Sequence, residues 1–423
     1  MTAAIANALT GSLEGPPIAR RKQFVVFPSS VASDPVGLDA YQDAGERTDR
    51  MPAGDLSMAV LGLFGEVGTL GCVLKKKRRD AAAYASYRAA LSEDLGDVLW
   101  YLSALASRTN LRLSDIASAA GRLSNPAVDL PCPFTFADLQ SVLQHASADS
   151  IVDRMVDLAT ASGALVGELK TRDRTATSKE SMREHLVAIL AAVISVANGV
   201  EVSLDRAARQ NLEKIFSRWP VEHRYSSMTD ENMPRNEQLP RYFELFIEEH
   251  SVNNKTYVVQ KRNNVIIGDR LTDNKAEKDD YRFHDVFHIA YAVHLGWSPV
   301  LRSLMRLKRK SRPDLDENED GARAILIEEG IATFIFGRAS ERHFFEGLDR
   351  LDYDLLKLVS DFVRGFEAEA CSLWQWERAI LDGFKIFRAL KSSRKGYVKA
   401  DLLAHTLTFE PSDERLATSR VEG

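Results

Sequence analysis

The segment EDLGDVLWYLSALA at residues 93–106 recurs in outline as EHLVAILAAVISVA at residues 184–197. In both copies apolar residues return every three or four positions, which is the period of a helix with a buried face rather than of a strand. The segments before them match too, because VGTL at 67–70 corresponds to VGEL at 166–169. Two copies of one helical unit can cover each other's apolar faces. We therefore predict a mainly α fold in which two tandem units pack as a pseudo-dimeric bundle.

Polar and proline-containing breaks divide the rest of the chain. Residues 221–240 carry few aliphatic side chains and are predicted to be a linker to a helical C-terminal domain with a small β-hairpin at 255–271. The predicted organisation is an N-terminal arm at 1–35, a first unit at 36–130, a second unit at 131–220, the linker, the C-terminal domain at 241–405 and a tail at 406–423.

The composition is that of a globular protein with little net charge. Across 423 residues, 55 Lys and Arg stand against 60 Asp and Glu, which gives a net charge of −5, and 45% of the residues are hydrophobic. These values exclude a disordered acidic protein and a strongly basic nucleic-acid binder, so nucleic acid is not expected as a partner.

The cysteines and the apolar runs indicate a reducing, aqueous compartment. Cys72, Cys132 and Cys371 are too far apart for a disulfide framework or a cysteine-type zinc site. The longest apolar run, 186–200, is shorter than the roughly 20 residues of a bilayer helix, and no secretory signal is evident. We expect a cytoplasmic protein without a membrane partner.

Acidic side chains interrupt both long helices of the first unit. Asp94 and Asp97 are three residues apart and share a helix face, Glu93 lies beside them, and Glu66 lies on the preceding helix. Carboxylates that converge from two helices repel one another unless a cation balances them, and Mg²⁺ prefers oxygen ligands. The alternative is a solvated acidic face. The acids stand directly before the apolar VLWYL, which counts against that alternative, but the spacing alone leaves both open.

A basic run, KKKRR at 75–79, follows the first of these helices. Lys75 and Lys76 are candidates to meet the phosphates of a substrate held at the metal. The run by itself is more typical of a solvated connection between helices.

Three segments of the first unit, 38–48, 62–71 and 93–106, resemble the MazG-like all-α nucleoside triphosphate pyrophosphohydrolases. That family has a Glu-x-x-Glu helix followed by a Glu-x-x-Asp helix, and together these bind Mg²⁺. Glu66 matches the first Glu and Asp97 the last Asp, whereas Thr69 stands at the second position and Asp94 replaces the next Glu. The resemblance implies that Glu66, Asp94 and Asp97 hold Mg²⁺ or Mn²⁺.

The second unit has lost most of this acidic pattern but ends in NLEKIFSRWP, residues 211–220. The ending resembles the family's closing Asn-x-x-Lys-x-x-x-Arg stretch, which is associated with nucleotide contacts. Asn211, Lys214 and Arg218 would share one helical face, with the amide reading a base or sugar edge and the cations holding phosphates. The alternative is a plain amphipathic terminal helix.

A second cluster is predicted in the C-terminal domain, which resembles an extension found on some MazG-like proteins over 284–301 and 319–331. His284, Asp285 and His288 fall within about one turn of a helix, and Glu328 and Glu329 interrupt an apolar helix further on. These side chains form either a second metal or acid–base site or a buried polar network that fixes helix register.

The resemblance implies an enzyme that converts a nucleoside triphosphate into the monophosphate and pyrophosphate. In this interpretation Glu93 orients the attacking water, and Lys75 or Lys76 neutralises the leaving pyrophosphate. Two alternatives remain open: a nucleotide-sensing or scaffold protein without turnover, motivated by Thr69 and the eroded second unit, and a two-site phosphohydrolase with a second metal in the C-terminal domain. A homo-oligomer is compatible with each of them.

Overall fold

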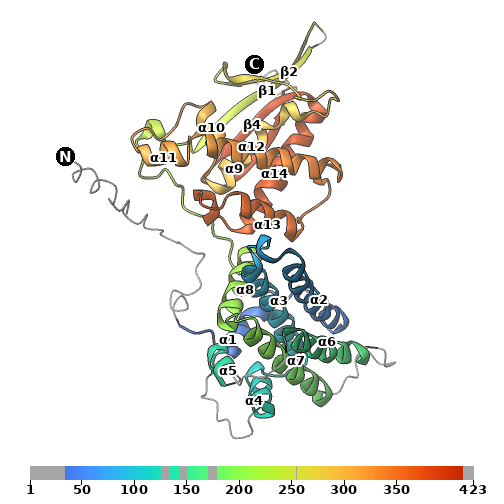
Figure 1. Ribbon diagram of the computed structural model, residues 1–423. Helices are drawn as coiled ribbons and strands as arrows, with labels where there is room; N and C mark the ends of the chain where they lie inside the picture. The colour runs from blue at the N-terminus through green and yellow to red at the C-terminus, as the bar shows by residue number, and fades with distance from the viewer. Residues whose placement is uncertain (1–33, 125–133, 143–149, 170–178, 254, 413–423) are drawn as a thin grey trace, which may run out of the picture.

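The structure is a computed structural model that describes residues 34–124, 134–142, 150–169, 179–253 and 255–412. Helices dominate it, so the predicted mainly α fold is confirmed. Figure 1 shows two lobes: a helical bundle built from the N-terminal half, and a mixed lobe in which helices cover a sheet. The predicted N-terminal arm falls almost wholly outside the described residues, as does the end of the predicted tail.

Each unit of the bundle contributes a short helix, two long helices and one of intermediate length. The first unit contains α1 (Leu38–Glu46), α2 (Ser57–Asp80), α3 (Tyr87–Arg108) and α4 (Leu113–Ser124), and the second contains α5 (Phe136–Val142), α6 (Ile151–Glu168), α7 (Lys179–Gly199) and α8 (Leu204–Arg218). The sequence repeat predicts the last three helices of each set. The short helices α1 and α5 carry no repeat signal.

The two units are interleaved. α2 packs on α3 and α6 on α7, whereas α8 crosses onto α3 and α4 onto α7, so the last helix of each unit covers a long helix of the other. Two backbone hydrogen bonds also link the starts of the two units. The N–H of Leu38 donates to the carbonyl of Phe134 at 3.3 Å, and the N–H of Phe136 donates to the carbonyl of Val36 at 3.1 Å. Such reciprocal pairing is what a pseudo-dimer requires.

Two helices of the bundle reach the length and apolarity of a membrane span. The stretch Ser57–Ala83 has a mean hydropathy of 1.7 with 33% of its apolar window buried, and Lys179–Gly199 has 1.2 with 50% buried. Length and composition alone are weak evidence for a span, because a core helix of a soluble protein passes the same test.

The C-terminal lobe contains an antiparallel sheet rather than an isolated hairpin. Its strands are β1 (Tyr242–Val252), β2 (Lys255–Arg262), β3 (Val265–Leu271), β4 (Lys395–Asp401) and β5 (Thr406–Pro411), in the order β3-β2-β1-β4-β5. The predicted hairpin is the β2–β3 pair. The predicted tail is corrected at its start, because residues 406–411 pair with β4.

Helices fill the chain between β3 and β4. They are α9 (Asp285–Leu295), α10 (Pro299–Leu304), α11 (Pro313–Asn318), α12 (Ala322–Ser340), α13 (Tyr353–Phe362) and α14 (Leu373–Ser393). α14 lies along α9 and contacts β4 and β5. Aromatic side chains form the core between them, for example Phe287 and Phe384 with ring centroids 4.4 Å apart. Figure 1 places α13 at the edge of this lobe, next to the bundle.

The second part of the segment predicted to be a linker, 228–240, is anchored in the C-terminal core, whereas no side chain of 221–227 is buried. The carboxylate of Asp230 is fully buried and accepts a hydrogen bond from the N–H of Leu239 at 2.7 Å. It also pairs with Arg241 and Arg302, each at 2.7 Å. The segment has few aliphatic residues because buried ion pairs hold it in place.

We expect Gly96→Ala to destabilise the bundle. A Cβ at this position would lie 2.8 Å from the carbonyl oxygen of Ala207 and 2.8 Å from the Cβ of Asn211, so α8 must move away from α3. Overpacking of this kind costs about 1–3 kcal/mol, measurable as a lower urea midpoint. Gly163→Ala in α6 is the matched control, because its Cβ meets nothing within 4 Å. An unchanged midpoint for Gly96→Ala would contradict the close packing.

Candidate functional site

The predicted acidic cluster is assembled where α2 packs on α3. Glu66 comes from α2, and Glu93, Asp94 and Asp97 come from α3. The negative charge of each of the three α3 carboxylates raises the pKa of Glu66. Asp94 is 9% exposed, and its Oδ2 has no hydrogen-bond partner among the described residues.

Helix α8 of the second unit supplies polar partners from the opposite side. The amide of Asn211 donates to Asp97 Oδ1 at 2.8 Å, and the ammonium of Lys214 bonds to the same oxygen. Tyr41 of α1 fixes the orientation of the amide, because its hydroxyl donates to Asn211 Oδ1 at 2.9 Å. Gly96 permits this arrangement, since only a residue without a side chain lets α8 approach α3 so closely. Two of the three residues predicted on α8 therefore lie at the acidic cluster.

The C-terminal lobe completes the cluster through α13. The hydroxyl of Tyr353 donates to Glu93 Oε1 at 3.0 Å, and the ammonium of Lys357 donates to Glu93 Oε2 at 2.6 Å. Sequence reasoning missed both residues. They stand about 260 positions from their partner, and no local pattern on α13 marks them.

The cluster has more negative than positive charge. Four carboxylates face the ammonium groups of Lys214 and Lys357, which leaves an excess equal to the charge of one divalent cation. Burial, reinforced by the charge of Asp97, raises the pKa of Glu66 from 4.5 to about 7. The same two causes raise the pKa of Asp94 from 3.8 to about 6. Buried carboxylates that lack counter-charge, one with an unpartnered oxygen, fit a hard divalent cation.

In this arrangement the ammonium groups occupy part of the space around the carboxylates. The oxygens of the four side chains do not form a group of three within 4.8 Å of one another. A cation at Asp97 would therefore have to displace the ammonium of Lys214, which now bonds to that carboxylate.

The remaining residues predicted on α2 lie apart from the cluster. Thr69 is exposed, and its hydroxyl donates to the carbonyl of Gly65 at 3.2 Å. Lys75 and Lys76 are exposed near the end of the helix. They are nine and ten residues beyond Glu66, which corresponds to about 14 Å along the axis. The structure does not bring these two lysines together with the carboxylates, because the helix continues straight past the cluster.

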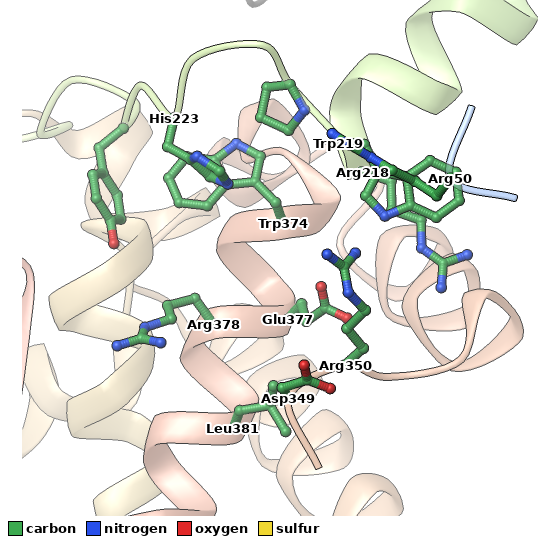
Figure 2. A pocket seen from close by; sticks show the side chains of 12 residues that line it. Arg50, Arg218, Trp219, His223, Asp349, Arg350, Trp374, Glu377, Arg378 and Leu381 are labelled. Atoms are coloured by element: carbon green, nitrogen blue, oxygen red, sulfur yellow. The ribbon is translucent and has the colours of Figure 1, made fainter. Parts of the chain in front are cut away.

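Arg218, the third residue predicted on α8, faces a cavity between the two lobes. The cavity has a volume of about 450 Å³ (Figure 2). Its wall includes four arginines and two tryptophans: Arg50, Arg218, Arg350, Arg378, Trp219 and Trp374. Tyr353 lies between this cavity and the acidic cluster, since its ring is 5.8 Å from the guanidinium of Arg218 and 5.2 Å from the ammonium of Lys214.

The predicted histidine cluster is assembled at the start of α9. Within the described ranges, His284, Asp285 and His288 form the group of ligand-type side chains whose ligand atoms all lie within 4.8 Å of one another. All three side chains are buried. The one-turn spacing brings them together as the sequence predicts.

The two glutamates of α12 have different partners, which the sequence does not distinguish. Glu328 is fully buried and accepts hydrogen bonds from His288 Nδ1 at 2.9 Å and from the hydroxyl of Ser298 at 2.7 Å. Glu329 has a side chain that is 37% exposed, and its two oxygens lie 3.6 Å from His284 Nε2 and 3.5 Å from His288 Nε2.

Comparison with known proteins assigns the C-terminal lobe. Residues 224–413 match the family model of the MazG C-terminal domain. The match begins inside the segment predicted to be a linker, in agreement with the buried position of Asp230.

The Gene 37 protein of Mycobacterium phage L5 is 35% identical over 88 residues, which are 19% of this chain and 77% of that protein. The chain belongs to the same family as this phage protein. No solved structure matches the chain.

We expect Glu66→Gln and Asp94→Asn to stabilise the metal-free protein at pH 8 but not at pH 5. Both carboxyl groups have pKa values, about 7 and about 6, above their values of 4.5 and 3.8 in the unfolded chain. The stability linked to their protonated forms is present below pH 4 and is lost as the pH rises through 6 to 7. The neutral variants keep that stability at pH 8. After solvent screening we expect a gain of about 1 kcal/mol for each.

Urea unfolding in the presence of EDTA at the two pH values measures this difference. Glu213→Gln, an exposed position on α8, is the control. If Glu66→Gln changed the free energy of unfolding equally at pH 5 and pH 8, the pKa of Glu66 would not be raised in the folded protein.

Proposed function

We propose that the N-terminal lobe is a Mg²⁺-dependent nucleoside triphosphate pyrophosphohydrolase. The observation that carries the proposal is the convergence of four carboxylates whose negative charge is only half balanced by the two lysines that face them. The match of residues 224–413 to the MazG C-terminal domain supports it, because that match associates the chain with MazG.

Glu66, Asp94 and Asp97 would hold the cation, which can be Mg²⁺ or Mn²⁺. When bound, such an ion lowers the pKa of a coordinated water and neutralises charge on the phosphates. The residues fit this role because burial has already removed much of the water that would otherwise solvate their charge.

Glu93 would orient the attacking water. Burial alone would raise the pKa of Glu93, but the hydrogen bond from Lys357 and the charge of Lys214 lower it overall. The carboxylate therefore stays ionised at neutral pH and can accept a hydrogen bond from water. The water oxygen attacks the α-phosphorus, the bond to the bridging oxygen breaks, and its electron pair leaves with pyrophosphate. The proton of the water passes by way of Glu93 to solvent.

Lys214 and Arg218 would bind the phosphates. With a cation held at Asp97, the ammonium of Lys214, which also lies 3.8 Å from Glu93 Oε1, would be available to a phosphate. Arg218 follows one turn later on α8, about 6 Å along the axis, at the edge of the cavity lined by arginines. This spacing suits a chain of phosphates that runs from the acidic cluster toward the cavity. The aromatic side chains of the cavity, Trp219 and Trp374, could stack on a base.

We expect Asp97→Ala to reduce pyrophosphate release from nucleoside triphosphates at least 100-fold. The variant removes a proposed metal ligand and the acceptor that Asn211 and Lys214 share. A panel of standard and modified nucleoside triphosphates with Mg²⁺ and with Mn²⁺ measures the effect and identifies the preferred base.

Two further variants separate the roles in the same assay. Arg218→Ala should raise KM about tenfold with little change in kcat, because it would remove a phosphate contact that is distant from the reacting bond. Glu213→Ala, on the exposed face of α8, should change neither constant. Equal activity of Asp97→Ala and the parent would rule out this site.

The second candidate function is a nucleotide sensor without turnover. Two observations favour it: Thr69 has its hydroxyl bonded within its own helix, and lysine ammonium groups already bond to Asp97 and Glu93. Nucleotide binding without pyrophosphate release under any divalent metal would establish this function in place of hydrolysis.

We expect Lys357→Met to tighten binding of Mg²⁺ to the bundle about three- to tenfold. The change removes one of the two cations that compete for the carboxylates while keeping the length of the side chain. Calorimetric titration measures the affinity, with Lys385→Met on α14 as the control. Weaker Mg²⁺ binding by Lys357→Met would show instead that Lys357 positions Glu93 for the metal.

A further inference from the structure

We propose that His284, Asp285, His288 and Glu329 bind one divalent transition-metal ion in the C-terminal lobe. This site is separate from the carboxylates of the bundle, and its existence does not depend on pyrophosphohydrolysis. Four features of the cluster support it: the fixed orientation of each imidazole, the spacing of the ligand atoms, the hydrogen bonds behind them and an opening to solvent.

The imidazole of His284 is held with one nitrogen directed at the cluster. Its Nδ1 lies 2.9 Å from the carbonyl of Tyr281, and because a carbonyl only accepts, Nδ1 carries the proton. In the neutral imidazole with its proton on Nδ1, Nε2 presents a lone pair to the cluster. The ring of Tyr281 stacks on that of His284 with centroids 4.3 Å apart and planes 2° apart, which fixes the direction of the lone pair.

The imidazole of His288 is oriented in the same way by a buried carboxylate. Its Nδ1 lies 2.9 Å from Glu328 Oε1. Glu328 also accepts hydrogen bonds from the hydroxyl of Ser298 at 2.7 Å and from the N–H of Val300 at 2.8 Å, so three donors hold its carboxyl group in place. In metal sites, a histidine ligand usually donates its other ring N–H to a carboxylate or carbonyl, which fixes the orientation of the ring. His288 Nε2 is completely buried, and within the described chain it has no hydrogen-bond partner.

The spacing of the ligand atoms suits a single ion. His284 Nε2 lies 3.2 Å from Asp285 Oδ1 and 3.6 Å from Glu329 Oε2, and His288 Nε2 lies 3.5 Å from Glu329 Oε1. Two ligands each about 2.1 Å from a tetrahedral ion are separated by about 3.4 Å. The observed separations lie on both sides of this value.

The two carboxylates differ in how firmly they are held. Asp285 is 5% exposed and accepts a hydrogen bond from the amide of Gln260 on β2, so its position is fixed by the sheet. Glu329 has a side chain that is 37% exposed and forms the side of the cluster that faces water. An ion bound here would exchange with solvent on the side of Glu329.

The ligands select the class of metal. Two imidazole nitrogens with two carboxylates favour Zn²⁺, a borderline ion, and after it Mn²⁺, which lies above Mg²⁺ and Ca²⁺ in affinity for nitrogen ligands. Glu328 is a positioning residue in this assignment, because all its contacts point away from the ion.

A buried polar network without metal would need a proton on Nε2 as well as on Nδ1 of both histidines, because both Nε2 atoms lie beside carboxylates. A metal ion satisfies both nitrogens and both carboxylates at once.

The test is metal binding by the full chain after treatment with EDTA. Calorimetric titration with Zn²⁺, Mn²⁺ and Mg²⁺ is made in the Asp97→Ala background, which disables the carboxylate site of the bundle. We expect one Zn²⁺ or Mn²⁺ ion per chain, bound much more tightly than Mg²⁺. Titration with Co²⁺ should produce the visible absorption of an ion with nitrogen ligands.

Variants of the cluster identify the ligands. His288→Gln should weaken binding at least 100-fold, and Glu328→Gln should weaken it about 10- to 100-fold with the stoichiometry unchanged. His343→Gln, at an exposed position, is the matched control and should bind as the parent does. If His288→Gln fails to fold, as circular dichroism would show, Glu329→Gln on the solvent side replaces it, with binding about tenfold weaker.

Two results would overturn the proposal. The first is the absence of transition-metal binding to the EDTA-treated chain, which would leave a hydrogen-bonded network with a protonated His288. The second is equal binding by the parent, His288→Gln and Glu329→Gln, which would place the ion elsewhere.

Discussion

The close approach of α8 to α3 at Gly96 determines the chemistry of the bundle. At this crossing an added Cβ would lie 2.8 Å from the backbone of α8, so the two helices touch through their main chains. The contact carries Asn211 and Lys214 of one unit to Asp97 of the other. The four carboxylates therefore come from the first unit, and the second unit supplies the amide and the ammonium group that contact Asp97. The raised pKa values of Glu66 and Asp94 follow from the burial that this packing creates.

Two kinds of buried acid occur in this protein. Some carboxylates of the C-terminal lobe are neutralised by arginine: Asp320 pairs with Arg309 at 2.8 Å, and Asp230 pairs with Arg302 at 2.7 Å. Such pairs hold loops in register and leave little charge for a ligand. In the bundle the lysines balance only half of the carboxylates. The contrast separates acids with a structural task from acids that are available to a cation.

The sequence predicts those parts of the molecule that depend on local spacing. The helical repeat predicts the bundle. The one-turn spacing of His284, Asp285 and His288 predicts that these side chains lie together, and in the structure their ligand atoms lie within 4.8 Å of one another. The sequence of β1 also has a pattern that indicates a strand, since the buried residues Phe243, Leu245 and Ile247 alternate with more exposed ones. Contacts between distant segments have no such signal. Tyr353 and Lys357 reach Glu93 only because two lobes dock, and the basic run that contains Arg309 is typical of a solvated face although that side chain is 1% exposed.

The docking of α13 also sets an order of events during synthesis. The pair between Lys357 and Glu93 joins residues 264 positions apart, so it can form only after residue 357 has been made. Domains generally fold as units during synthesis, the N-terminal one first. Until Lys357 is added, the acidic cluster has one lysine fewer, and a nascent chain therefore presents a more negative cluster than the finished protein.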